Sequence, residues 1–281
     1  MSVGLVLEGG GTRSWYTSGV LTALNEEQIE FPTVYGVSAG ALTALSYISG
    51  QLTRNNAAAY MKNMRDRRFM SIGNLRQTGS YFGFDFMLEA LPRQTPFDYQ
   101  TFFRSPVGLK VGTTDLETGR PVYFEKAELD EKFTPVRASC SLPFLTNIVE
   151  YRNYHLLDGG CSEPIPVERS IKDGNEKNVI VLTQDVSYRE RRGSRLMDFA
   201  LARKYKKYPN FICSMERHAQ VYNRELAICT RLEQQNKAVV LRPDGRFIMR
   251  RYRDPNQLMR MYQMGIYDCK EKLPLIRKFV S

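Results

Sequence analysis

The 281-residue chain is 42% hydrophobic and 25% charged, which is ordinary for a globular protein and argues against wholesale disorder. Its longest apolar runs fall far short of the roughly 20 residues that a membrane-spanning helix needs, and its first eight residues predict a strand, not a signal peptide. Its five cysteines include no C-x-x-C pair, so we expect reduced thiols in a cytoplasmic protein without a metal or cofactor.

The net charge of +10 comes entirely from the last third of the chain. Residues 1–185 carry 18 basic and 21 acidic side chains, a net charge of −3, whereas residues 186–281 carry 22 basic and 9 acidic ones, a net charge of +13. A segment this basic could contact nucleic acid, an anionic membrane surface or a negatively charged substrate. Its charges could equally lie on helix faces that contact only water.

The first 50 residues predict a parallel α/β arrangement. The apolar run Val3–Leu7 is typical of a strand buried on both faces, and apolar spacing predicts a helix from Ser14 to about Glu27. A second strand, Thr33–Val37, precedes a helix of small residues, Ala39–Ile48. Strand–turn–helix repeated in this way predicts a three-layer α/β/α fold with a mostly parallel central sheet.

Weaker patterns extend this fold through the middle of the chain. Residues 68–83, rich in glycine and arginine, predict a loop that could act as a lid. The other expected elements are helices at Asn55–Arg67 and near Phe84–Leu91, strands at Val107–Thr113, Arg120–Phe124 and Val179–Thr183, and a hairpin of Asn147–Tyr151 with Tyr154–Leu157.

Beyond residue 185 the pattern becomes basic and mainly helical. We expect helices at about Arg195–Tyr208 and Asn210–Gln235, a short strand at Ala238–Leu241, and a helix that begins at Asp254-Pro255 and runs to Lys272. The prediction is therefore a first domain of residues 1–185 and a region of residues 186–281 that packs on it or is appended to it.

A G-x-S-x-G motif, Gly36-Val37-Ser38-Ala39-Gly40, lies between the second strand and its helix. In this setting the serine lies at a sharp turn with its hydroxyl exposed. Glycines on both sides let strand and helix approach each other without a Cβ clash, and the helix N-terminus favours negative charge nearby. The position of the motif predicts that Ser38 is a nucleophile.

A glycine-rich turn, Gly9-Gly10-Gly11-Thr12-Arg13, follows the first strand directly. Backbone N–H groups free of side chains can converge there on an anion. One interpretation is an oxyanion hole for acyl transfer, because this turn and Ser38 would both lie at the carboxyl ends of parallel strands. A phosphate cradle for a nucleotide is the rival, although the G-x-G-x-x-G and Walker A patterns both fail here. A plain tight turn is the third.

The turn Asp158-Gly159-Gly160 ends another apolar strand and offers Ser38 a base. A serine hydrolase normally uses histidine in that role, and this chain has only His155 and His218. His155 lies three residues before Asp158, so strand alternation places it on the opposite face. His218 falls in a basic amphipathic helix, where a solvent or core histidine is the expected interpretation. Asp158 is therefore the preferred partner of Ser38.

These three motifs, in this order, resemble those of the patatin-like phospholipases of the bacterial type. The segment Ala138–Phe144 (ASCSLPF) is similar to the A-S-x-A-x-P-x-F segment that precedes the aspartate strand in that family. The chain departs from the family at Ser14, where glycine is usual, and at Glu163-Pro164, where Asn-x-Pro is common. The resemblance covers roughly residues 1–185.

The resemblance implies a Ser–Asp dyad that hydrolyses acyl esters of lipids, phospholipid or lysophospholipid, without histidine, metal or cofactor. Carried over by position, Ser38 is the nucleophile and Asp158 the base. The oxyanion hole is then formed by the backbone amides around three residues, Gly10, Gly11 and Thr12. The remaining motif positions are Gly9, Arg13, Gly36, Gly40, Gly159 and Gly160.

Two other classes of function stay open at this point. One is a conventional α/β-hydrolase esterase that uses a histidine. The other is a module that binds lipid or nucleic acid and whose hydrolase site has decayed, although Ser38, Asp158 and the three glycines are intact.

The basic region of residues 186–281 could make a peripheral contact with an anionic membrane, which we favour over nucleic acid. Its core-filling candidates are Met259, Met261 and Met264. Its headgroup and interface candidates are Lys204, Lys206, Lys207, Arg250, Arg251, Arg253 and Arg260, with Tyr205, Tyr208, Tyr252, Tyr262 and Tyr267.

Overall fold

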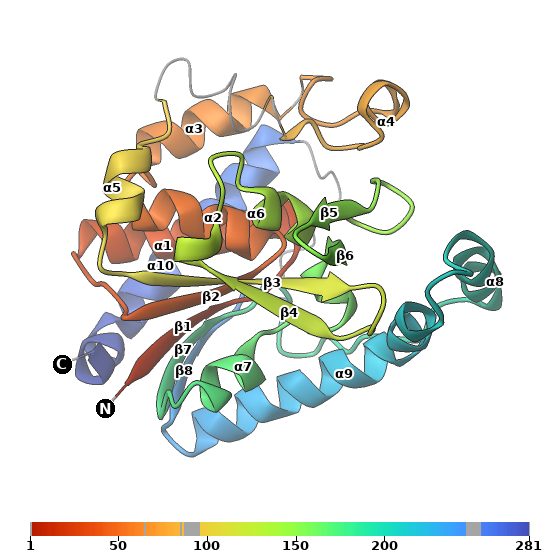
Figure 1. Cartoon of the computed structure of the whole chain (residues 1–281). Coiled ribbons are helices and arrows are strands. Elements are labelled where there is room, and N and C mark those ends of the chain that lie inside the picture. The colour runs from red at the N-terminus through yellow and green to blue at the C-terminus, as the bar shows by residue number, and fades with distance from the viewer. Residues whose placement is uncertain (1, 65, 85, 87–95, 246–253, 281) are drawn as a thin grey trace.

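A mostly parallel sheet forms the centre of the computed structural model, which describes residues 2–64, 66–84, 86, 96–245 and 254–280 (Figure 1). Its strand order is β5-β6-β3-β2-β1-β7-β8, and β4 pairs with β3 off this path. The strands are β1 (Val3–Leu7), β2 (Thr33–Val37), β3 (Gly108–Asp115), β4 (Pro121–Glu125), β5 (Val149–Tyr151), β6 (Tyr154–Asp158), β7 (Lys177–Val181) and β8 (Ala238–Leu241).

Strands β3, β2, β1, β7 and β8 are mutually parallel, whereas β4 and β6 run antiparallel to β3. The helices are α1 (Trp15–Glu26), α2 (Ala39–Ile48), α3 (Arg54–Asn63), α4 (Ile72–Thr78), α5 (Tyr99–Arg104), α6 (Thr134–Ser139), α7 (Val167–Lys172), α8 (Arg195–Lys204), α9 (Pro209–Gln234) and α10 (Pro255–Val280).

Helices cover both faces of the sheet, and the alternation of β1 divides the core between them. Leu5 and Leu7 belong to one hydrophobic cluster, which includes residues of α1, α2, α3 and α10. Val6 points the other way, into a cluster that includes residues of α7 and α9. Period-two alternation in a strand buried on both faces requires two apolar layers. The predicted three-layer α/β/α fold is confirmed.

Three differences from the expected elements have local causes. The segment 68–83 contains α4, because the Ser71 side chain caps this helix by accepting from the Asn74 N–H and Gly79 ends it at φ 74°. Helix α10 continues past Lys272, since Ile276 and Phe279 are buried although Pro274 lies within the helix. Helices α5, α6 and α7 were not predicted, because six residues are too few to show a helical repeat of apolar side chains. The helix predicted near Phe84–Leu91 lies largely outside the described residues.

The C-terminal region completes the same sheet and core. Strand β8 pairs in parallel with β7, and α10 packs along α1. A Cβ on Gly19 would collide with the Tyr262 carbonyl, and one on Gly265 would collide with that of Tyr16, so glycines let the two helices touch. The division at residue 185 stays a proposal about domain organisation, and the sheet continues across it.

Some of the predicted surface side chains are instead internal. Tyr262 is buried and donates its hydroxyl to Thr22, and Tyr205 is buried as well, so neither can meet a membrane. Met259, Met261 and Met264 pack in or against the core as expected. Arg250, Arg251, Tyr252 and Arg253 lie outside the described residues.

Within the described parts of the chain, we find no helix with the length and apolar character needed to cross a membrane.

Candidate active site

Ser38 occupies the tight turn between β2 and α2 with φ 55° and ψ −129°. A non-glycine residue in this region costs roughly 1–3 kcal/mol, and such strain occurs mostly at functional sites. The turn is possible because a Cβ on Gly36 would lie 2.7 Å from the Ala41 Cα, and one on Gly40 would lie 2.7 Å from the Leu7 carbonyl oxygen. The two glycines of the motif thus have a steric role.

Asp158 meets Ser38 directly. The Ser38 hydroxyl donates to Asp158 Oδ2 at 2.7 Å, and Oδ1 of the same carboxylate accepts from the Gly160 N–H at 2.7 Å. The β6 backbone is fixed here, because the Thr114 hydroxyl donates to the Asp158 carbonyl at 2.8 Å. A Cβ on Gly159 would collide with a β3 carbonyl, that of Gly112, so β3 and this turn are in close contact.

Burial raises the pKa of Asp158 to about 7. Transfer of a carboxylate out of water disfavours its charged form, and the hydrogen bonds from Ser38 and Gly160 only partly oppose this effect. At neutral pH the side chain is therefore divided between its acid and its carboxylate forms. A group with this pKa can both accept and return a proton.

Ser139 holds the serine turn, and sequence reasoning missed its part. Its hydroxyl oxygen accepts from the Ser38 N–H at 2.7 Å and donates to the Gly112 carbonyl at 2.6 Å. The side chain is buried at the end of α6 and joins the Ser38 turn to β3. The only sequence signal was its place in the ASCSLPF segment, which carried no role for it.

The glycine-rich turn lies against Ser38. A Cβ on Gly9 would be 3.1 Å from the Ser38 Cβ, and one on Gly10 would be 2.6 Å from the Thr183 hydroxyl. Gly11 begins a 3₁₀ turn at φ 54°. The Gly9 N–H donates to Pro164, whereas the amides of Gly10, Gly11 and Thr12 have no acceptor among the described residues. These amides are free to bind an anion beside Ser38.

Glu8, the residue before the glycine-rich turn, fixes the start of that turn through its buried side chain. The sequence analysis did not predict this role. Glu8 is buried and accepts hydrogen bonds from the Thr183 N–H and, at 2.7 Å, from the Tyr222 hydroxyl. Burial raises the pKa of Glu8, and the nearby Arg13 guanidinium opposes that rise. Arg13 Nε is itself buried without a partner among the described residues. The sequence signal that could have indicated the role of Glu8 is the position of its carboxylate between an apolar strand and three glycines.

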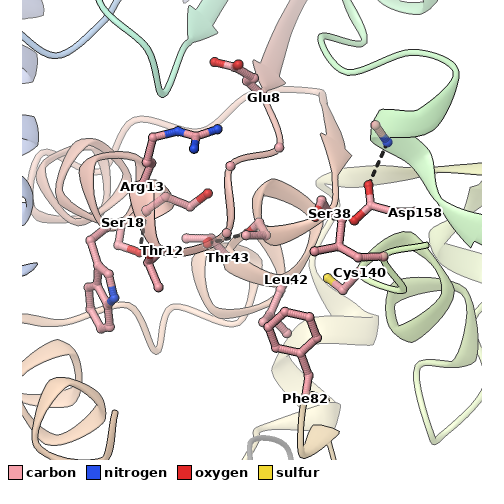
Figure 2. Close-up of a pocket in the computed structure, with 18 of the residues that line it drawn as sticks. Glu8, Thr12, Arg13, Ser18, Ser38, Leu42, Thr43, Phe82, Cys140 and Asp158 are labelled. Atoms are coloured by element: carbon pink, nitrogen blue, oxygen red, sulfur yellow. Dashed lines mark hydrogen bonds between the residues drawn. The ribbon is translucent and has the colours of Figure 1, made fainter. Parts of the chain in front are cut away.

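A cavity of about 540 Å³ opens over Ser38 and Asp158, within the 300–1,000 Å³ typical of ligand pockets. Ser38 and Asp158 lie together in Figure 2, with Leu42 and Phe82 on one side of them and Glu8 and Arg13 on the other. The apolar side of the cavity is lined mainly by α2, α3 and the residues that flank α4: Leu42, Leu45, Leu52, Ala57, Met64, Phe69, Met70, Phe82 and Phe84.

His218 and Cys140 also line the cavity. Burial lowers the pKa of His218, and burial together with Asp158 raises that of the Cys140 thiol well above its ordinary value. Both side chains are thus neutral near pH 7. Within the described residues, no hydrogen bond joins either histidine to Ser38 or Asp158; His155 lies instead beside Glu117, at 3.3 Å. His218 was expected in solvent or in the core, but its side chain lies in the wall of the cavity.

The structure thus brings together the predicted residues Ser38, Asp158 and Gly160 with the Gly9–Arg13 turn, at the carboxyl ends of β1, β2 and the antiparallel β6. In the described part of the chain, no three His, Cys, Asp or Glu side chains are placed to hold a metal. The arrangement offers a hydroxyl, a buried carboxylate and free amides beside an apolar cavity.

Two family models match this chain. A family model described as patatin-like phospholipase matches residues 5–171, and one described as a domain of unknown function (DUF6363) matches residues 208–281. The Escherichia coli K12 protein YjjU is 28% identical over 186 residues, which cover 64% of this chain and 52% of that protein.

Similar values hold for an NTE family protein of Mycobacterium tuberculosis H37Rv, Rv1063c. It is 27% identical over 168 residues, 59% of this chain and 44% of its own length. The chain therefore spans about half the length of the curated relatives it matches.

Proposed function

Because this chain belongs to the patatin-like phospholipase family, we propose that it is a serine acyl hydrolase that cleaves carboxylic ester bonds of lipids, with a phospholipid or lysophospholipid as substrate. One observation carries the proposal: the Ser38 hydroxyl donates directly to the Asp158 carboxylate at 2.7 Å, at the polar end of a largely apolar cavity. A hydroxyl beside a base supplies the nucleophile, and the apolar walls suit an acyl chain.

The proposed reaction begins with proton transfer from Ser38 Oγ to Asp158. Oγ attacks the ester carbonyl carbon, and the oxyanion that forms accepts hydrogen bonds from the amides of Gly10, Gly11 and Thr12, with the Ala39 amide at the start of α2 as a further donor. Loss of one such donor typically costs about 3–4 kcal/mol of transition-state stabilisation. As the C–O bond breaks, Asp158 returns the proton to the departing alcohol or lysolipid oxygen, which leaves an acyl-enzyme on Ser38.

The second half of the proposed reaction uses the same groups. Asp158 takes a proton from water, whose oxygen attacks the acyl carbon, and the amides again hold the oxyanion. The Ser38 Oγ–acyl bond then breaks, Oγ regains the proton from Asp158, and the free fatty acid leaves. The carboxylate alternates between base and acid, which suits its pKa of about 7.

The rate should follow the ionisation of Asp158. The free enzyme needs Asp158 as a carboxylate, and burial raises its pKa to about 7, so activity is lost as the pH falls through 7 and carboxylate becomes acid. We expect kcat/KM for an uncharged ester to rise about tenfold per pH unit below pH 6 and to level off above pH 8. A profile measured from pH 5 to 9 checks this, and a flat profile would exclude Asp158 as the titrating base.

Ser139 should act through the position of Ser38. We expect Ser139→Ala to lower kcat about 10- to 100-fold with little change in KM, because it leaves the half-buried Ser38 N–H without its side-chain acceptor and frees the turn. Ser170→Ala is the matched control: it removes another buried hydroxyl, bonded to Asn178. Steady-state kinetics with a thermal melt should show both variants destabilised and only Ser139→Ala slowed. Equal kcat for the two would contradict the assignment.

Narrowing the apolar side of the cavity tests the substrate class. Ala57 on α3 is buried and lines the cavity, whereas Ala59 on the same helix does not line it. We expect Ala57→Phe to lower kcat/KM for long-chain esters at least tenfold while a two- to four-carbon ester is little affected, since the added ring takes the space of distal methylenes.

The readout is kcat/KM over a series of lysophospholipids and simple esters of increasing acyl length, with Ala59→Phe as the control. Wild-type rates that do not depend on chain length would argue against an acyl chain in this cavity.

A further inference from the structure

Helix α8 exposes large apolar side chains to solvent. Leu196, Met197 and Phe199 are 78%, 53% and 67% exposed, and Leu201 is the one large apolar side chain of this helix that is buried. In Figure 1, α8 projects from the body of the molecule beyond the end of α9. A helix of a globular domain normally turns its apolar residues inward, so a cluster of this kind marks a surface for contact.

The same segment is strongly basic. Residues 186–208 contain eight basic and two acidic side chains, a net charge of +6. All eight basic residues are exposed: Arg189, Arg191, Arg192, Arg195, Arg203, Lys204, Lys206 and Lys207. We call these eight, with the exposed Val186, Leu196, Met197 and Phe199, the α8 surface.

Both ends of α8 are tied to the rim of the cavity. Before the helix, Glu190 lines the cavity, and its backbone N–H and carbonyl are bound by the Asn223 side chain of α9, at 3.0 and 2.9 Å. After it, the Tyr205 hydroxyl accepts from the Phe144 N–H at 3.2 Å, directly after two residues that line the cavity, Leu142 and Pro143. Arg195 is five positions after Glu190 in the chain, so α8 begins within about 18 Å of this residue of the cavity wall.

We propose that the α8 surface docks the protein on an anionic lipid bilayer and so brings the cavity to its substrate; the inference rests on the proposed lipid hydrolase function. Exposed leucine and phenylalanine within a cluster of basic residues match the two components of an interface, acyl boundary and anionic headgroups. A nucleic acid would use the charge and leave the apolar residues exposed to water. A second copy of the chain would bring two surfaces of like charge together, which is unfavourable.

Vesicle binding by the Ser38→Ala chain separates docking from hydrolysis. We expect it to co-sediment with vesicles of phosphatidylglycerol and phosphatidylcholine at 0.05 M salt, to bind pure phosphatidylcholine at least tenfold more weakly, and to lose most of this preference at 1 M salt, where screening shortens the Debye length to about 3 Å. Leu196→Ser with Phe199→Ser should weaken binding at least tenfold, and Arg191→Gln with Arg195→Gln about tenfold or more.

Matched controls carry the same changes elsewhere on the surface. Tyr267→Ser with Leu275→Ser changes two exposed apolar side chains of α10, and Arg231→Gln with Lys237→Gln removes two exposed charges near the far end of α9. We expect vesicle binding within twofold of the parent for both pairs. On a soluble two- to four-carbon ester, the α8 variants made on the wild-type chain should keep wild-type activity, so a failure of docking is distinguishable from a failure of the hydrolase proposal.

Three results would overturn the proposal. The first is the absence of binding to anionic vesicles even at 0.05 M salt. The second is equal loss of binding in the α8 and control variants. The third is a wild-type dimer in sedimentation velocity that Leu196→Ser with Phe199→Ser converts to monomer, which would assign the α8 surface to a second copy of this chain.

Discussion

Ser38→Ala is expected to lower kcat/KM for an acyl ester by at least about 10⁴-fold, the largest effect that the proposed site predicts. Removal of the nucleophile abolishes the acyl-enzyme route, and what remains over the uncatalysed reaction comes from the amides and from binding. Ser49→Ala is the control, because it removes a buried hydroxyl at the other end of α2 that lies outside the cavity.

The measurement is the rate of release of fatty acid from a lysophospholipid, together with a thermal melt to confirm folding. Ser38→Gly should be as inactive as Ser38→Ala but more stable by about 1 kcal/mol, since glycine adopts φ 55° without strain. Retention of wild-type activity in a folded Ser38→Ala sample would exclude Ser38 as the nucleophile.

Asp158→Asn is expected to abolish activity and to stabilise the protein. The asparagine side chain has nearly the same shape and keeps an acceptor for the Gly160 N–H, but it cannot accept the Ser38 proton. We expect a loss of at least about 10³-fold in kcat. A variant that is inactive and more stable than the wild type would indicate that the carboxylate is kept for chemistry at a cost to the fold.

The sign of the stability change follows from the pKa of Asp158. Its folded pKa of about 7 lies above the ordinary value of 3.8, so between these two pH values the native state holds a proton that the unfolded chain releases. The free energy of unfolding of the wild type therefore falls as the pH rises from about 4 to 7, and at pH 8 the loss is roughly 4 kcal/mol. Asparagine does not ionise, so Asp158→Asn avoids this loss of stability.

Melting temperatures at pH 8 should thus favour Asp158→Asn by on the order of 10 °C, with a smaller advantage at pH 5. Asp115→Asn is the control: Asp115 is also buried, but its oxygens accept from the Thr118 N–H and hydroxyl, so its replacement should not stabilise the protein. A melting temperature of Asp158→Asn below that of the wild type at pH 8 would contradict the claim that burial of the Asp158 carboxylate destabilises the fold.

Local patterns predicted the framework of the site well. Strands β1 and β2 and helix α2 have the bounds expected from their apolar runs, because hydrophobic periodicity and glycine-bounded turns act over a few residues. Equally local motifs pointed to Ser38, the Gly9–Arg13 turn and Asp158 as the candidate site residues. The general rule that sites form at the carboxyl ends of parallel strands placed the Gly9–Arg13 turn beside Ser38. It does not cover Asp158, which ends the antiparallel β6 and was paired with Ser38, 120 residues away, because a serine nucleophile needs a base.

Contacts without a local signature were not predictable. The hydroxyl of Ser139 reaches Ser38 across 101 residues, and Tyr222 reaches Glu8 across 214, so the partner of each is set by tertiary packing alone. His218 lines the cavity because α9 crosses beside the Gly160 turn, which its helical pattern could not reveal. The short helix α4 was obscured by glycine and arginine, although Ser71 and Gly79 now account for both its ends.

Labelling with a fluorophosphonate, followed by mass spectrometry of the adduct, tests the central claim most directly. The probe reacts with a serine only where a base and an oxyanion site activate it, which is the arrangement proposed for Ser38, Asp158 and the Gly9–Arg13 turn. We predict one adduct on Ser38 in the wild-type chain and at least a 100-fold slower reaction in Asp158→Asn. An adduct at another serine, or equal labelling of the folded Asp158→Asn chain, would contradict the Ser38–Asp158 assignment.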